Sequence, residues 1–415
     1  MYNIVDMIVA GRFVSASSIS AVANAGVVMN MITVVIIGLT TGGNILIGQY
    51  FGAKNKEGCK DAAVTLLSSA LILGCAVAVI FYILSLPVLT VLKVPVLEEA
   101  TQYLKICSTG IIFIAGYNAV SAMLRAAGNS RAPLICISVT TVMNIILDII
   151  LVIVYDMGVA GVALSTVISQ GVSFIVAVVI VLQNREVFGI KLTGLYIKAQ
   201  SLRKILKLGI PCAVQMSVAS ISWLSVAYLI NSHGVVVSSG NGVSIKIKEF
   251  CQLFVNAMSL ASASMVAQNI GAEKYDRARE VIYTALKITI CMAAVIIALI
   301  EIFAPWIVKI FTVDKATAEA AVLNLRVEII GQIFYAVILI GHSLMIGAGD
   351  TWFAFFSSFI NCILFRLPLA FLLNHFFGIV GVYLACMIAP SSSIPFFLWY
   401  DRSNRWKRSL VKIIS

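Results

Sequence analysis

Charged residues are scarce in this chain of 415 residues: they make up 11% of it, whereas 61% of its residues are hydrophobic. Its mean hydropathy of +1.04 is far from that of soluble globular domains. A membrane β-barrel would show short segments of alternating polarity, but the apolar runs here are long and continuous. Only helices and closed barrels satisfy their backbone polar groups in lipid, so the sequence predicts an all-α polytopic membrane protein.

The residue patterns of most enzymes are also missing. Histidine occurs only 3 times, and no two histidines have the spacing of a zinc site. Neither the phosphate-binding pattern GxxxxGK[ST] nor the nucleophile pattern GxSxG is present. The 9 cysteines are scattered singly without a CxxC pair, so we interpret them as small apolar side chains. We therefore expect no enzymatic activity and no bound cofactor.

The long apolar runs predict about eleven full membrane spans after a short apolar piece at 1–11. Basic residues gather in alternate loops, which by the positive-inside rule places the segment 184–204 and the C-terminus in the cytoplasm of a multi-pass cell-membrane protein. This pattern explains the net charge of +11 without a nucleic-acid partner. The basic tail Arg402–Lys412 is predicted to face lipid. The predicted full spans are 22–48, 62–92, 101–124, 132–155, 160–183, 205–230, 245–268, 280–308, 321–346, 352–374 and 378–400.

Three motifs of the first half recur about 220 residues later in the second half. An even number of spans lies between the copies, so the halves are predicted to be parallel repeats related by a pseudo-two-fold axis along the membrane normal. The predicted domains are an N-terminal six-helix lobe at 1–190 with a partial first helix, a cytoplasmic linker at 191–204, and a C-terminal six-helix lobe at 205–415. The paired motifs are Gly52-Ala53 with Gly271-Ala272, Gly128 with Gly349, and Gly158 with Gly378.

Acidic residues inside the predicted spans are the main candidates for function, because a charge in lipid is costly without a partner. Asn144 and Asp148 are four residues apart and share one helix face. Asp6 lies in the first apolar piece, and two carboxylates in one apolar site would share a proton or a metal cation. Other charges have plainer interpretations, since Asp156 falls at a turn, Glu249 has lysines beside it and Glu301 lies near a span end. Arg366 is predicted to pair with an acid or a backbone carbonyl.

Several motifs together resemble the multidrug and toxic compound extrusion (MATE) family, and they cover nearly the whole chain. They are Asp6-Met-Ile-Val-Ala-Gly11-Arg12, Gly48-Gln49-Tyr-Phe-Gly52-Ala53, Arg125-Ala-Ala-Gly128-Asn129, Asn144-Ile-Ile-Leu-Asp148, Met157-Gly158-Val-Ala-Gly161-Val-Ala and Gln268-Asn-Ile-Gly271-Ala272. The resemblance implies two six-helix lobes, alternating access, and secondary antiport of Na⁺ or H⁺ against organic, often cationic, compounds. It also implies a monomer that works among membrane lipids.

The resemblance further implies a cation-coupling site made by Asp6, Asn144, Asp148 and Thr166, which could hold Na⁺. The chain departs from the family pattern in two ways. Its seventh span carries Gln215 where some branches have an acid, so a second site in the C-terminal lobe is not expected. Its first helix lacks roughly the front half, which suggests an incomplete start.

Two alternatives compete with drug efflux. A flippase for lipid-linked oligosaccharides belongs to the same superfamily, but such flippases often carry extra C-terminal spans and basic cavities. A membrane-embedded enzyme would need a clustered nucleophile, a metal set or paired acids at a membrane face. The sequence shows none of these features.

Overall fold

The computed structural model describes residues 16–92, 94, 96–183, 188, 194–312, 314–408 and 410. These residues form α-helices with short π-helical and 3-10 segments, and no β-strand occurs among them. The predicted all-α class is therefore confirmed. The chain divides into two compact units, Met1–Ala213 (unit 1) and Val214–Ser415 (unit 2).

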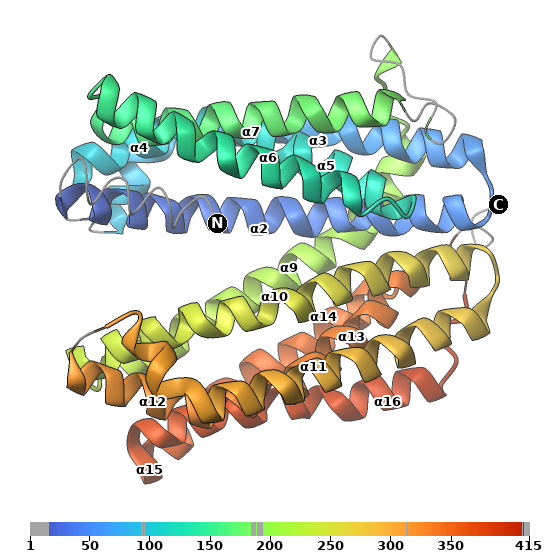
Figure 1. The fold of residues 1–415 in the computed structure, drawn as a ribbon. Coiled ribbons are helices and arrows are strands. Elements are labelled where there is room, and N and C mark those ends of the chain that lie inside the picture. The colour runs from blue at the N-terminus through green and yellow to red at the C-terminus, as the bar shows by residue number, and fades with distance from the viewer. Residues whose placement is uncertain are drawn as a thin grey trace. The chain divides into compact units, whose positions relative to one another are not determined.

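Unit 1 is built from long helices and one bent helix pair (Figure 1). The bend of 44° separates α4 from α5 at Gly110, in the middle of the predicted span 101–124. The helices of unit 1 are α2 (Ala16–Gly52), α3 (Lys56–Val91), α4 (Leu97–Thr109), α5 (Ile111–Ala126), α6 (Arg131–Asp148), the π-helical η1 (Ile149–Val154), α7 (Gly158–Gln183) and the first part of α9 (Ala199–Asn231).

Unit 2 has a similar bend of 49° between two of its helices, next to Gly331. Its last apolar stretch, Thr351–Arg402, is interrupted at Gly378, whose backbone is not helical. Besides the rest of α9, unit 2 contains α10 (Val235–Gly271), α11 (Tyr275–Lys309), α12 (Lys315–Ile329), α13 (Gln332–Ala348), α14 (Thr351–Phe359), the π-helical η3 (Ile360–Arg366), α15 (Leu367–Ile388), the 3-10 segment η4 (Ala389–Ser393) and α16 (Ile394–Arg402).

The described helices agree with the predicted spans. Eight of them are long and apolar enough to cross a membrane, or up to 10 if each bent pair is one span. The break at Gly378 divides Thr351–Arg402 where the sequence predicts the boundary between its last two spans. The first apolar piece, 1–11, lies outside the described residues.

The boundary between the two compact units falls inside α9, between Ala213 and Val214. Pro211 lies in the same helix, just before the boundary. The end of the linker is held to unit 1 by Asp61 of α3, which accepts a hydrogen bond from Tyr196 at 2.5 Å and forms an ion pair with Lys198. These contacts explain why the linker belongs to unit 1.

The repeated motifs form matching left-handed turns at the ends of helices. Lys54 and Glu273, which follow the two Gly-Ala pairs, have φ values of 57° and 59°. Gly128 and Gly349 have φ values of 86° and 85°, and Gly158 and Gly378 both have 56°. The sequence repeat is therefore also a repeat of backbone conformation.

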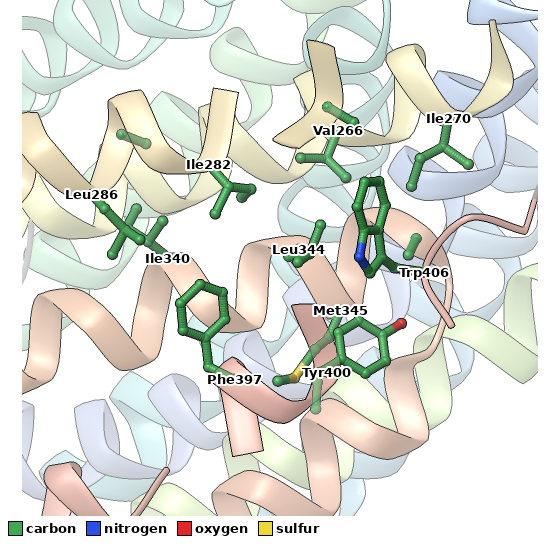
Figure 2. Packing of buried hydrophobic residues seen from close by; sticks show 14 residues of the cluster. Val266, Ile270, Ile282, Leu286, Ile340, Leu344, Met345, Phe397, Tyr400 and Trp406 are labelled. Carbon is green, nitrogen blue, oxygen red and sulfur yellow. The ribbon is translucent and has the colours of Figure 1, made fainter. Parts of the chain in front are cut away.

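The apolar core of unit 2 includes the beginning of the C-terminal tail (Figure 2). Trp406 is 1% exposed, and its indole nitrogen donates to the Asp401 carbonyl at 3.1 Å. Arg279 and Tyr283 of α11 both bond to the Asp401 carboxylate. Trp406 therefore anchors the tail in the core, where burial of a large aromatic ring is favourable. The basic residues Arg402, Arg405, Lys407 and Arg408 of the tail are exposed, and their contact with lipid stays a prediction.

Candidate functional site

The buried face of α6 carries the polar pair that the sequence singles out. Asn144 and Asp148 are both 0% exposed and lie one helical turn apart. Directly after Asp148 the helix continues as η1, which is π-helical. Such segments are rare and are often found at functional sites. Two of the four predicted site residues, Asn144 and Asp148, thus lie together on one buried helix face.

Ser165 of α7 completes this group. Its hydroxyl donates to Oδ1 of Asp148, and Nδ2 of Asn144 lies 3.4 Å from the same hydroxyl oxygen. Helices α6 and α7 pack against each other within unit 1, so these contacts join neighbouring helices. The sequence analysis did not select Ser165, although it stands next to the predicted Thr166.

Thr166 has a different environment from its neighbour. Its hydroxyl donates to the Val162 carbonyl at 3.0 Å, and its side chain lines a cavity of about 380 Å³ within unit 1. Adjacent residues of a helix point about 100° apart, so Ser165 and Thr166 cannot both face α6. On α7, Thr166 therefore faces the cavity while Ser165 faces Asp148.

The cavity is formed by α2, α4, α5, α6 and α7, and none of the described residues that line it is charged. Its wall combines aromatic rings with uncharged polar groups. This mixture is typical of pockets for small organic molecules, in which apolar surface gives affinity and a few polar groups fix orientation. Representative lining residues are Asn30, Tyr103, Phe113, Tyr117, Asn118 and Gln170.

A line of hydroxyl groups extends from the buried acid toward this cavity. Thr140, one turn before Asn144, lies 3.4 Å from the Ser173 hydroxyl, and Ser173 lines the cavity. Ser169 is fully buried one turn from both Ser165 and Ser173 on α7. The serine spacing of four residues is the sequence signal that would have identified this face of α7.

The oxygen atoms around Asp148 fit a small hard cation. A carboxylate, a hydroxyl and a carboxamide lie together, and Oδ1 of Asn144 has no hydrogen-bond partner among the described residues. Oxygen donors of these kinds are what hard cations prefer. The same atoms could equally surround a protonated carboxyl group. Asp6, the fourth predicted member, lies outside the described residues, and the coupling role of all four stays a prediction.

The polar groups of unit 2 differ from those of unit 1. Gln215, at the position where the sequence lacks an acid, lies 3.1 Å from Nδ1 of the buried His342. The other ring nitrogen of His342 lies 3.3 Å from the Ser357 hydroxyl. These three residues form a hydrogen-bonded chain between α9, α13 and α14.

Sequence reasoning missed a buried ion pair in unit 2. Lys248 pairs with Glu328, and both are 6% exposed. The partners lie on α10 and α12, so no local spacing links them. The simpler interpretations of two other acids agree with the structure: Glu249 forms a surface pair with Lys246 at 3.1 Å, and Glu301 remains partly exposed near Arg326.

Arg366 has neither of its predicted partners among the described residues. Its Nη2 donates to the Asn361 side chain at 3.3 Å, and its guanidinium carbon lies 4.7 Å from the centre of the Trp223 ring. Two buried acids of unit 2, Glu328 and Asp401, are instead paired with Lys248 and Arg279.

Comparisons with known proteins agree with this architecture. The MatE family model matches residues 1–150 and 211–372. The probable multidrug resistance protein YoeA of Bacillus subtilis is 27% identical over 99% of this chain and 91% of its own length. The multidrug export protein MepA of Staphylococcus aureus is 23% identical over 84% of this chain and 78% of its own length.

A solved structure shows the same fold. It is described as the outward-facing conformation of a multidrug resistance MATE family transporter of the MOP superfamily, and it matches with a TM-score of 0.90 at 21% identity. The match covers 97% of this chain and 91% of that chain. Because the family model also covers more than half of the sequence, the chain belongs to the MatE family of membrane transporters, the family that its motifs predict.

Proposed function

We propose that this protein is a secondary active multidrug exporter, which exchanges Na⁺ or H⁺ for organic, often cationic, compounds by alternating access. It would act as a monomer in the cell membrane, with the linker and the C-terminus in the cytoplasm. The names of the relatives favour drug efflux over the flipping of lipid-linked oligosaccharides. The observation that carries the coupling proposal is the fully buried Asp148 with its partners Asn144 and Ser165.

The energetic argument starts from the cost of a buried charge. An ionised carboxylate in an apolar interior is unfavourable, so the binding of H⁺ or Na⁺ at Asp148 changes the local electrostatics strongly. A bound ion shifts a transporter between two states only by its difference in affinity for them. The ion affinity of a site with one carboxylate and few neutral oxygens changes with small changes in geometry. Two conformations of the transporter can therefore differ in their affinity for the ion.

The cavity supports the assignment of substrates. A volume of about 380 Å³ is within the range for small organic ligands. Aromatic walls attract planar and cationic compounds through dispersion and cation–π contacts. Thr166 and Ser173 line the cavity and also belong to α7, which holds Ser165 against Asp148. Substrate in the cavity and the ion at Asp148 therefore act on one helix, and each should change the affinity of the other.

The first prediction concerns Asp148→Asn, which keeps the shape of the side chain but removes its charge. We expect the variant to lose gradient-driven efflux of ethidium from cells or proteoliposomes, by about tenfold or more, because the ion-binding charge is gone. Asp156→Asn is the matched control, since Asp156 lies at an exposed turn with a φ of 51° that asparagine also tolerates. Its efflux should match that of the unchanged protein.

The coupling ion is identified by the same assay. Efflux is measured with and without a sodium gradient at fixed pH, and then with and without a pH gradient in the absence of sodium. Normal efflux by the Asp148→Asn variant, at normal abundance in the membrane, would contradict the proposal. An equal loss in the Asp156→Asn variant would mean that the effect is not specific to the buried site.

A further inference from the structure

The most unusual polar group of unit 2 is the guanidinium of Arg366. The residue is 6% exposed and ends the π-helical segment η3. Nη2 donates to the Asn361 carboxamide oxygen at 3.3 Å, whereas Nε and Nη1 have no hydrogen-bond partner among the described residues. Arginine keeps its charge in proteins and offers five N–H donors. Most of the hydrogen-bonding capacity of this buried cation is therefore unused.

Arg366 has no ion-pair partner among the described residues. The buried acid Glu328 of the same unit forms an ion pair with the buried Lys248. Lys248 also donates to Asn324 at 3.2 Å, which fixes the pair further. Glu328 is therefore already paired with a cation, and it does not balance the positive charge of Arg366.

The surroundings of Arg366 also include an aromatic surface. The guanidinium carbon lies 4.7 Å from the centre of the Trp223 ring. Trp223 is 40% exposed, so one part of the indole packs on the buried cation while another part is open at the surface. The exposed indole of Trp223 therefore contacts the guanidinium group that carries the unused N–H donors.

A purely structural role explains these observations less well. An arginine that only holds helices together normally spends its donors on carbonyl oxygens or an acid, because unpaired buried charges are costly. Here one weak bond to Asn361 and the stacking on Trp223 replace such partners. The arrangement instead resembles a site that is completed by a ligand with a negative charge.

We propose that Arg366 forms an anion-binding site in unit 2, which takes the carboxylate of an aromatic organic acid while Trp223 stacks on its ring. Carboxylates match the planar fork of a guanidinium, and an aromatic ring gains contact area on the indole. The proposal rests on the transport function above and extends it, because the protein would then accept organic anions as well as cations. Uncharged walls in unit 1 and a basic site in unit 2 would serve different substrates.

Binding to the purified full-length protein in detergent tests the site directly, with benzoate and acetate as probes. We expect benzoate to raise the melting temperature in a saturable way and acetate to have little effect, since acetate lacks the ring. Arg366→Gln should weaken benzoate binding by tenfold or more, and Arg366→Lys should retain part of it. Trp223→Leu should remove the preference for benzoate over acetate. Arg326→Gln is the matched control, because Arg326 is a half-exposed cation of the same unit near Glu301.

Transport by proteoliposomes separates failure of this inference from failure of the proposed function. The unchanged protein should export both ethidium and fluorescein, and Arg366→Gln should lose fluorescein export while keeping ethidium export within about twofold. If the unchanged protein exports neither dye, the proposed function fails. If it exports ethidium but binds no benzoate, or if chloride alone protects it, the organic-anion site is wrong. Equal loss of ethidium and fluorescein export in a folded Arg366→Gln variant would likewise overturn the inference. If that variant does not fold, the benzoate titration of the unchanged protein decides.

Discussion

At the scale of single residues, the group around Asp148 shows what a sequence motif can and cannot reveal. Asn144 and Asp148 are found from their spacing, because one helical turn separates them on a face that the structure buries. Ser165 was not found, because its contact with Asp148 depends on the rotation of α7 against α6. That rotation is fixed by packing, and hydrophobic periodicity does not report it in a helix that is apolar on all sides.

Two buried serines of α7 give a matched test of this contact. Ser165 donates to Asp148, whereas the Ser169 hydroxyl, one turn away and equally buried, has no partner among the described residues. Ser165→Ala should destabilise the protein by about 1–3 kcal/mol, because a hydrogen bond to a buried carboxylate is lost, while Ser169→Ala should be nearly neutral. Thermal melting in detergent measures both changes. Similar losses in the two variants would show that helix packing, and not the hydrogen bond, is responsible.

At the scale of elements, the break at Gly378 can be tested apart from packing. Its φ and ψ of 56° and −141° are accessible to glycine almost alone. Nothing lies within 4 Å of a Cβ added at Gly378, so Gly378→Ala introduces strain without a steric clash. We expect a loss of about 1–3 kcal/mol in the free energy of unfolding.

Gly242 provides the control for that substitution. It lies inside α10, and a Cβ added there also meets nothing within 4 Å. Because its backbone is helical, Gly242→Ala should stabilise the protein by about 0.5–1 kcal/mol. The two substitutions should thus have opposite signs in thermal or denaturant unfolding. A neutral Gly378→Ala variant would mean that the two last spans are joined without a strained residue.

The contact between the linker and α3 leads to a prediction about pH. The hydrogen bond to the Asp61 carboxylate raises the pKa of Tyr196 from 10.0 to about 12, and it also raises the pKa of Lys198. A group whose pKa rises on folding stabilises the folded state below its unfolded pKa and loses this effect as the pH passes its folded pKa. Both residues should therefore stabilise the linker contact fully at neutral pH, and lose this contribution only in strongly alkaline solution.

Tyr196→Phe makes this expectation measurable. The difference in melting temperature between the variant and the unchanged protein should be constant from about pH 6 to 9 and should shrink above about pH 10. Lys204→Gln is a useful comparison, because Lys204 contacts Tyr50 at 2.9 Å and not Asp61. A difference that disappears already between pH 6 and 8 would show that another group controls the linker.

At the scale of the whole molecule, the orientation in the membrane remains to be measured. Arg203 lies at the end of the predicted cytoplasmic linker and is exposed, whereas the nearby Ser201 is buried and unsuitable for labelling. Single cysteines at Arg203 and at the exposed Ser239, in a cysteine-free background, should react from opposite sides. An impermeant maleimide added outside cells should label Ser239→Cys and spare Arg203→Cys. The reverse pattern would invert the proposed topology.

The sequence predicts the membrane spans of this protein better than the contacts between them. Spans, their order and the repeated motifs follow from apolar runs and from glycine, which are local signals. The ion pair of Lys248 with Glu328 joins two residues that are distant along the chain. Trp406 is buried against residues that are also distant in sequence. The bends at Gly110 and Gly331 also escaped prediction, since a single glycine in an apolar helix is common.

The π-helical segments have an evolutionary consequence. Matching turns at Gly128 and Gly349 precede the two segments, and matching turns at Gly158 and Gly378 follow them, as expected if an ancestral gene was duplicated. In the first copy the segment directly follows an acid, Asp148, and in the second copy it ends in a base, Arg366. Duplication thus preserved the turns, whereas the π-helical segments begin at different distances from them and carry buried charges of opposite sign. One ancestral scaffold would then have given rise to two sites of opposite selectivity within a single chain.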